Sequence, residues 1–444
     1  MLTFLDLTRI STRLLRGAPT GIDRVEFAYA QELVQKENYG EVVSVITTPL
    51  FTGAVRHGTM RTLLDRIERS WLLDSETGLE DPFYGELRAA IEAPAATDRP
   101  HALRLKRQSR RQAMGRALQL PVQEMVRSRA RLAAATNRSA GGARSYFHCS
   151  HTQTDKPQRF AWLERRGVPA VFFIHDAIPV LYPEFCSPGS AARHHARLQT
   201  ASERGALLIV NSEATKRSVA GYMESQGWRV PEIEVVPLGV DRWFSDRDAP
   251  RPRAPNAPYF VCIGTIEPRK NLIFLFNVWR ELARRHGPNT PKLVLVGRRG
   301  WENENMIDVL ERSTSLAPHL IEVADLPDLG LAALLKGARA LLAPSQVEGF
   351  SLPVAEALSL GTPVVASDIA VHREVADGHA RLLGTIDGNG WVEAIEGLTD
   401  VDGPSRAEAL KRAQGYSAIS WGRHVELSME IVSRVAEHAR GRPV

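Results

Sequence analysis

Short apolar runs rich in β-branched residues alternate along most of the chain with stretches in which apolar residues recur every three or four positions. The first pattern indicates buried strands and the second indicates amphipathic helices. Their alternation predicts βα units and therefore parallel sheets covered by helices. The expected strands occupy residues 3–7, 41–47, 145–148, 170–174, 207–210 and 233–236, and then 259–263, 292–296, 320–323, 340–343 and 363–366.

These strands fall into two series, which predicts two domains. The chain has 444 residues, enough for two α/β domains of about 200 residues each. We expect an N-terminal Rossmann-like domain at 1–244, with a helical, Arg-rich insertion at about 53–145. A Pro- and charge-rich stretch, 245–258, has the composition of a linker. The second Rossmann-like domain is expected at 259–420, and a final helix, 421–444, is expected to pack back toward the first domain.

Composition narrows the class of protein. The chain is 43% hydrophobic and 24% charged, as in soluble globular proteins. No apolar run reaches the roughly 18 residues of a membrane span. The N-terminus lacks the pattern of a secretory signal, and the three cysteines lack metal-ligand spacing. We therefore expect a cytoplasmic protein with reduced cysteines.

The net charge of +5 is concentrated in the insertion. Between Arg99 and Arg144 there are 12 Lys and Arg residues and one acid, so this segment carries +11 and the rest of the chain −6. No aromatic residue lies between His101 and Ser145 to stack on bases, which argues against a nucleic-acid-binding protein. Two interpretations of the segment fit equally well. It could contact an anionic membrane, which attracts each basic residue by about 1 kcal/mol, or it could be a solvated helical excursion.

Two glutamates, Glu348 and Glu356, lie in the segment PSQVEGFSLPVAEALSLGTPVVASD, residues 344–368. An apolar run precedes it, so Glu348 falls on a strand-to-helix loop and Glu356 early in the helix. Ser351 can cap that helix, and free amide groups at 349–352 can bind phosphate or sugar hydroxyls at the carboxyl edge of the sheet. Glu356 can take a ribose diol. Taken alone, such a pair is more often a loop acid and a solvated helix residue.

Six segments together carry a resemblance to a known family. They are IHDAIPVLYPE (174–184), VNSEATKRSV (210–219), VVPLGVD (235–241), GTIEPRKN (264–271), LVLVG (293–297) and the segment at 344–368. Their order and spacing resemble those of the large retaining glycosyltransferase family usually called family 4 (glycosyltransferase group 1), whose signature is EGFGLPxxEA. The resemblance implies a GT-B fold, in which two Rossmann-like domains face each other across a cleft and the C-terminal one binds the donor nucleotide.

The resemblance also implies roles for single residues. Arg269 and Lys270 match the basic pair that binds the donor pyrophosphate, where cations stabilise the charge of the leaving group. Glu348 matches the glutamate that holds the donor sugar, and Glu356 the one that binds ribose. Main-chain contacts to sugar or phosphate are implied for Gly349, Phe350, Ser351 and Leu352, and contacts to the nucleobase for residues 322–326.

One position departs from the family pattern. Many relatives carry an Arg directly after the glycine that ends the first strand of this domain, where this chain has Thr265. The second phosphate-binding cation is then either Arg269 itself or Arg298. The pair Arg298-Arg299 also fits a solvated loop, so this alternative stays open.

In the N-terminal half, His175 follows the expected strand AVFFI and matches a family histidine at the reaction centre. A histidine at a strand end can hydrogen-bond the donor sugar or its developing positive ring. Asn211 and Ser212 at the next strand end fit a helix cap, although they also face the cleft. Gly21 ends the loop GAPTG, which resembles the family's first glycine-rich loop; an anion site and a plain loop fit equally well.

The expected reaction moves a hexose from a nucleoside diphosphate to an acceptor hydroxyl, with retention of configuration and without a metal. No metal-binding motif is recognised, and the DxD-like stretch at 246–248 lies in the linker. The HDAIP and EPRKN variants resemble those of bacterial mannosyltransferases of surface polysaccharides. GDP-mannose is therefore the first choice of donor, followed by UDP- and dTDP-sugars. The expected acceptor is a saccharide, polyprenyl-linked, at the inner face of the plasma membrane.

Three other classes share some of these features. A sugar-nucleotide epimerase of GT-B-like fold has the same architecture but is not expected to carry the EGFSLPVAEA segment. A nucleic-acid-binding protein would use the basic segment of the insertion. A catalytically silent scaffold is disfavoured because Lys270, Glu348 and Glu356 are all present.

Overall fold

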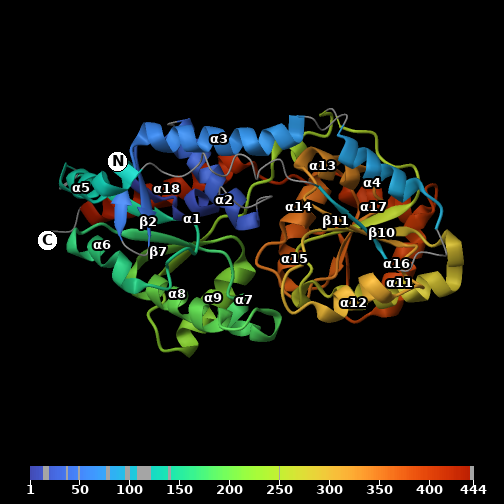
Figure 1. Ribbon diagram of the computed structural model, residues 1–444. Coiled ribbons are helices and arrows are strands. Elements are labelled where there is room, and N and C mark those ends of the chain that lie inside the picture. Colours follow the sequence, from blue (N-terminus) through green and yellow to red (C-terminus); the bar gives the residue numbers. More distant parts are fainter. Residues whose placement is uncertain are drawn as a thin grey trace.

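The computed structural model describes residues 1–13, 20–36, 39–48, 51–76, 81–95, 101–107, 122–138, 142–249 and 251–440 of the protein. Within this part of the chain, two seven-stranded sheets form the centres of two lobes that lie side by side (Figure 1). The strand order is β3-β2-β1-β5-β6-β7-β8 in the N-terminal sheet and β14-β13-β12-β9-β10-β11-β4 in the C-terminal sheet. The predicted pair of Rossmann-like sheets is therefore confirmed.

The N-terminal sheet is parallel except at one edge, where β3 runs antiparallel to β2. Its central strands, such as AVFFI in β6, are continuous apolar runs, as expected when helices cover both faces of a sheet. Its strands are β1 (Leu2–Asp6), β2 (Glu41–Thr47), β3 (Thr52–Ala54), β5 (Arg144–His148), β6 (Ala170–Ile174), β7 (Gly205–Val210) and β8 (Glu232–Val235). Its helices include α1 (Thr8–Arg13), α2 (Gly21–Ala30), α6 (Ala161–Arg165), α7 (Ile178–Leu181), α8 (Ser190–Arg204), α9 (Glu213–Ser225) and α10 (Arg242–Ser245).

The C-terminal sheet is parallel throughout. Its strands from this half of the chain are β9 (Tyr259–Ile263), β10 (Lys292–Val296), β11 (Leu320–Ala324), β12 (Leu341–Ala343), β13 (Val364–Ser367) and β14 (Arg381–Leu383). The helices are α11 (Leu272–His286), α12 (Glu304–Arg312), α13 (Asp328–Gly337), α14 (Leu352–Ser359), α15 (Ala370–Ala376), α16 (Gly388–Thr399) and α17 (Pro404–Ala413). Every strand expected from the sequence is present, with its ends within two residues of the expected ones.

The insertion contributes elements to both lobes, which the sequence did not predict. From the N-terminal lobe, α3 (His57–Glu76) runs along one side of the molecule to reach α13, and α4 (Pro82–Glu92) lies on the C-terminal lobe (Figure 1). Strand β4 (Leu103–Lys106) then joins the C-terminal sheet beside β11. Helix α5 (Val122–Arg138) returns to pack on β3. The expectation of an all-helical insertion is thus corrected: in LRLK, alternating leucines form the two-residue period of a half-buried edge strand.

The C-terminal helix α18 (Trp421–Arg440) packs against α2 and β5 of the N-terminal lobe. Burial lowers the pKa of His424 to about 4, so its ring is neutral at physiological pH. Because the carbonyl of Pro237 can only accept, His424 Nδ1 donates to it over 2.7 Å. Nε2 is then the acceptor for the Tyr29 hydroxyl at 2.8 Å, and that hydroxyl also lies 2.7 Å from Ser428 Oγ. A buried polar network therefore fixes α18 on the lobe.

No helix of the described residues is long and apolar enough to cross a membrane. Part of the basic segment, including residues 108–121, and residues 17–19 of the glycine-rich loop lie outside the described residues.

The substitution Tyr29→Phe tests how α18 is held. It removes the buried donor to His424 Nε2 while keeping the ring, so we expect the free energy of unfolding to fall by about 1–3 kcal/mol. The measurement is the urea midpoint followed by circular dichroism, with Tyr182→Phe, an exposed tyrosine, as the matched control. An unchanged midpoint for Tyr29→Phe would contradict the docking network.

Candidate functional site

The centre of the candidate site is the carboxylate of Glu348, which lies between two cations. Arg269 Nη1 is 2.5 Å from one carboxylate oxygen and Lys270 Nζ is 2.5 Å from the other. The hydroxyl of Ser345 donates a third hydrogen bond over 2.7 Å. Arg269 Nε also contacts Glu267 at 2.5 Å. The structure therefore brings three residues predicted from two separate motifs into one buried cluster.

The charges of this cluster set its protonation. Burial alone would raise the pKa of Glu348, but Arg269 and Lys270 outweigh it and hold that pKa well below its usual range. The carboxylate is therefore ionised at physiological pH. Burial raises the pKa of the neighbouring Glu267, although both cations oppose that effect.

The backbone explains how the cations reach Glu348. Gly264 directly follows strand β9, and its φ of +145° favours glycine; a short 3-10 turn, Pro268–Lys270, comes next. A Cβ at Gly264 would lie 2.6 Å from Lys270 Cε, so the lysine side chain crosses directly over this glycine. A side chain at Gly264 would push Lys270 away from Glu348.

Thr265 and Arg298 lie in two loops that are joined to each other. The amide of Ile266 donates to the carbonyl of Arg298 over 2.8 Å. The Arg298 guanidinium points to Asp325, with its Nε 2.7 Å from the carboxylate, and its side chain is 45% exposed. Arg298 is thus neither simply solvated nor part of the Glu348 cluster.

The loop before α14 differs in one respect from the expectation. Ser351 does not cap the helix with its side chain, because its φ of +69° places the residue in the left-handed region. Its hydroxyl instead lies 3.1 Å from Nε2 of His372. Phe350 is buried in the apolar core, so only its main chain is available to a ligand, and Pro353 stands in the first turn of α14.

Glu356 is buried rather than solvated. It is 4% exposed on α14, and the charged groups around it are Arg24 of α2, Asp328 of α13 and Asp241. Arg24 forms an ion pair with Asp328 across the two lobes. Burial raises the pKa of Glu356 from 4.5 to about 8; Arg24 opposes this rise and the two aspartates add to it. The glutamate expected to bind ribose therefore lies at the contact between the lobes.

His175 lies directly against the loop of Glu348. Its Nε2 is 2.9 Å from the carbonyl of Cys149, which can only accept, so Nε2 carries the proton. Burial lowers the pKa of His175 to about 4, so the ring is neutral and Nδ1 is an acceptor. A Cβ on Gly349 would lie 2.5 Å from the His175 carbonyl, so only glycine permits this close approach.

Further hydrogen bonds join the lobes beside His175. The hydroxyls of Ser212 and Thr215 donate to the carbonyl of Gly349 over 2.8 and 3.0 Å. Ser212 also caps α9, as the sequence suggested. At the same helix end, the amides of Glu213 and Ala214 donate to the carboxylate of Glu374, at 2.6 and 3.1 Å. The two lobes are therefore in direct contact at the carboxyl ends of their strands.

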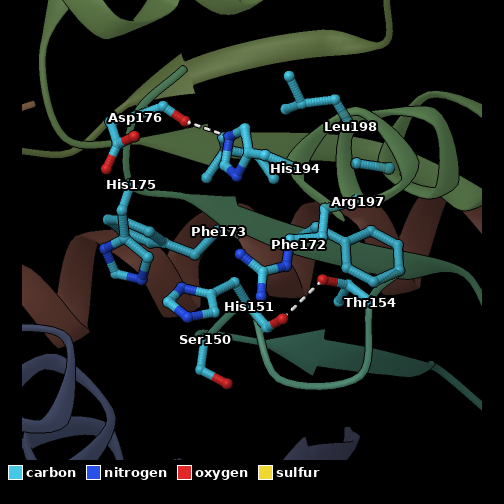
Figure 2. Close-up of a pocket in the computed structure, with 12 residues that line it drawn as sticks. Ser150, His151, Thr154, Phe172, Phe173, His175, Asp176, His194, Arg197 and Leu198 are labelled. Carbon is cyan, nitrogen blue, oxygen red and sulfur yellow. Dashed lines mark hydrogen bonds between the residues drawn. The ribbon is translucent and has the colours of Figure 1, made fainter. Parts of the chain in front are cut away.

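A small cavity adjoins His175 on the side of α8 (Figure 2). Its volume is about 20 Å³, which is room for about one water molecule and not for a sugar ring. Figure 2 shows the rings of His151 and His175 and the guanidinium of Arg197 around it, with His194 bonded to the carbonyl of Asp176 at 2.9 Å. The cavity therefore lies behind the candidate site and does not hold the substrates.

Gly21 begins α2, but its loop is only partly described. Thr20 and Asp23 form a capping box at this helix start, and Arg9 Nε contacts Asp23 at 2.6 Å. Side chains of the protein thus already cap the first turn of α2. No described contact joins Gly21 to the Glu348 cluster.

Sequence reasoning missed four residues of this region: Arg24, Glu267, Asp328 and Ser345. Glu267 lies within the EPRKN motif and Ser345 within the 344–368 segment, so proximity to a motif could have marked them. Arg24 and Asp328 carry no such signal, because their pairing depends on how the two lobes meet. Among the described residues, no three His, Cys, Asp or Glu side chains are grouped as a metal site requires.

Comparison with solved structures agrees with this architecture. The crystal structure of Anabaena Alr3699/HepE in complex with UDP and glucose aligns with a TM-score of 0.59 and covers 98% of this chain and 100% of that one, at 14% identity. At that identity the likeness shows the fold alone. The chain thus has the GT-B fold.

Sequence comparison shows which proteins parts of the chain are similar to. Residues 257–400 match the family "Glycosyl transferases group 1". Serotype-specific mannosyltransferase WbdA of Escherichia coli is 27% identical over 290 residues, which are 62% of this chain and 35% of the relative. The O-antigen chain mannosyltransferase B of Escherichia coli is 38% identical over 125 residues, 28% of this chain and 32% of that protein. The chain thus spans about a third of the length of these two relatives.

The raised pKa of Glu356 predicts a pH-dependent stability. Between pH 4.5 and 8 the folded protein holds a proton that the unfolded chain has released. The contribution of Glu356 is therefore fully present below pH 4.5 and is lost as pH rises through 8. Glu356→Gln cannot titrate, so from pH 5 to pH 8.5 the wild type should lose up to about 4 kcal/mol more stability than this variant.

Urea denaturation of both proteins at the two pH values measures this difference. Glu393→Gln, at an exposed glutamate on α16, is the matched control and should follow the wild type. Parallel pH profiles for wild type and Glu356→Gln would show that Glu356 is ionised in the folded protein.

Proposed function

We propose that the protein is a glycosyltransferase that moves a hexose, mannose first, from a nucleoside-diphosphate donor to a saccharide acceptor. The observation that carries the proposal is the Glu348 carboxylate held by Arg269 and Lys270, with His175 of the other lobe against the same loop. Two cations and a carboxylate at the carboxyl ends of the strands fit the two parts of a sugar nucleotide. The cations suit the diphosphate and the carboxylate suits the sugar hydroxyls.

The donor would bind mainly to the C-terminal lobe. The diphosphate would replace Glu348 as partner of Arg269 and Lys270, with amides of residues 349–352 as further donors. Glu348 would then accept hydrogen bonds from the sugar, and Glu356 would take the ribose hydroxyls. Arg298 lies close to Thr265 in space, because its carbonyl accepts from the amide of Ile266, and it would add a second phosphate contact if it left Asp325. The residues supply positive charge to the diphosphate without a resident metal.

The reaction would proceed on one face of the sugar, with retention. The bond between the anomeric carbon and the diphosphate oxygen breaks, and a bond from that carbon to the acceptor oxygen forms. The proton of the acceptor hydroxyl moves to the departing diphosphate oxygen. Arg269 and Lys270 stabilise the charge that develops on the leaving group. The neutral ring of His175 can accept a hydrogen bond from a donor-sugar hydroxyl through Nδ1.

The choice of mannose and of a lipid-linked acceptor has separate support. Both Escherichia coli relatives are named as mannosyltransferases, one of them of the O-antigen chain. GDP-mannose is therefore the first donor to test, with UDP- and dTDP-sugars next because a structural neighbour holds UDP. The basic segment between Arg99 and Arg144 would meet anionic lipid at the inner face of the plasma membrane.

Calorimetric titration with GDP, UDP and dTDP, with and without magnesium, tests the donor site. One nucleotide should bind regardless of magnesium. Lys270→Ala removes a cation from the diphosphate and Glu356→Ala removes the ribose acceptor, so each should weaken binding at least about tenfold. Glu393→Ala is the control and should bind as the wild type does. If none of the nucleotides binds, or both site variants bind as well as the wild type, the assigned donor site is wrong.

Glu348→Gln separates binding from catalysis. It removes the charge that competes with the diphosphate, so the nucleotide should bind as tightly as in the wild type or more tightly. Turnover should fall by at least about a hundredfold, because the carboxylate no longer stabilises the positive sugar ring. Calorimetric titration measures the binding and transfer of radiolabelled hexose measures the turnover, while mass spectrometry of the protein detects any covalent adduct. A glycosyl adduct trapped on a carboxylate would contradict the one-face mechanism.

A further inference from the structure

Three exposed apolar side chains gather where the two lobes meet. Leu181 and Tyr182 follow β6 in the N-terminal lobe and Trp301 follows β10 in the C-terminal lobe; they are 41%, 40% and 41% exposed. The indole Nε1 of Trp301 donates to the carbonyl of Phe185 over 3.0 Å, across the lobes. The rings of Tyr182 and Phe185 are stacked, 6.1 Å apart and inclined by 12°. We call Tyr182, Phe185 and Trp301 the aromatic rim.

The aromatic rim borders the candidate site on both sides. The loop that carries Trp301 is tied to the loop before Arg269, because the amide of Gly300 and the side chain of Asn303 both donate to the Ile266 carbonyl at 3.0 Å. On the other lobe, the chain leads from His175 to Tyr182 through the short helix α7. Burial raises the pKa of the adjacent Cys186 thiol to about 11, and the nearby carboxylates of Asp176 and Glu267 add to this. The rim therefore lies next to charged groups of the site.

The chemistry of the rim fits a sugar better than a lipid or a protein. A pyranose has one apolar face of C–H bonds and a polar edge, so it matches a flat aromatic ring flanked by hydrogen-bonding groups. The exposed carboxylates of Glu184, next to Phe185, and of Glu302, next to Trp301, would repel an anionic membrane. Three side chains cover far less than the roughly 800 Å² per partner of a stable protein interface.

We propose that the aromatic rim is the acceptor-binding platform, on which a saccharide unit stacks while its hydroxyl reaches the anomeric carbon of the donor. The inference rests on the proposed function and adds the surface that takes the acceptor. Because the rim combines residues of both lobes, the platform is complete only when the lobes are together. The hydrogen bond of Trp301 to Phe185 orients the indole and leaves part of it open to the ligand.

Binding to an array of α- and β-linked mannose, galactose and glucose oligosaccharides tests the platform. Trp301→Ala and Tyr182→Ala each remove a ring and should lower the affinity of the bound oligosaccharide about tenfold. Trp301→Phe keeps a ring but loses the bond to Phe185, and its affinity should stay within about threefold of the wild type. Val401→Ala, at another exposed apolar residue far along the chain, is the matched control and should be unchanged.

The outcomes are separable from those of the donor site. Each variant is also titrated with the nucleotide that the wild type binds, and this affinity should not change. If the wild type binds nucleotide but no oligosaccharide, or if Trp301→Ala binds oligosaccharide as well as the wild type, the platform is overturned while the proposed function stands. If Trp301→Phe loses as much affinity as Trp301→Ala, Trp301 acts through its contact with Phe185 and the stacking role is overturned.

Discussion

The buried carboxylate of Glu348 and its two cations form the constraint around which the site is arranged. A buried ion pair adds little net stability, because the charges lose more hydration than their attraction returns unless every partner is satisfied. Here Arg269, Lys270 and Ser345 satisfy Glu348. Removal of any partner leaves a buried charge, so the cluster holds the loops after β9 and β12 in register. In the proposed function an incoming diphosphate would offer the cations an equivalent partner, so the same cluster would stabilise the fold and bind the ligand.

The second constraint is the direct contact of the lobes at the carboxyl ends of their strands. Gly349 accepts hydrogen bonds from Ser212 and Thr215, and Arg24 pairs with Asp328 near the buried Glu356. The insertion adds covalent crossings, since it leaves the N-terminal lobe through α3 and contributes β4 to the other sheet before it returns. Groups of both lobes therefore surround the position at which the sugar would react. The aromatic rim lies along the same contact between the lobes.

Much of the fold could be predicted from the sequence, because buried parallel strands are continuous apolar runs and their alternation with helices leaves few topologies. The motifs predicted which residues belong to the Glu348 cluster, but they did not predict that Glu348 forms ion pairs with Arg269 and Lys270. Strand β4 was not predicted because its two leucines lie in a strongly basic stretch. The capping role expected for Ser351 failed because the backbone there is left-handed. The burial of Glu356 against Arg24 depends on how the two lobes approach each other, and the local pattern of apolar and polar residues does not predict that approach.

The central claim is that Arg269 and Lys270 are held in place by Glu348 until a nucleoside diphosphate takes them over. A crystal structure of the protein with the nucleotide that it binds tests this most directly. The account predicts diphosphate oxygens within hydrogen-bond distance of both Arg269 and Lys270, the ribose on Glu356, and Glu348 released toward the space for the sugar. A diphosphate bound elsewhere, with Glu348 still paired to both cations, would contradict the account.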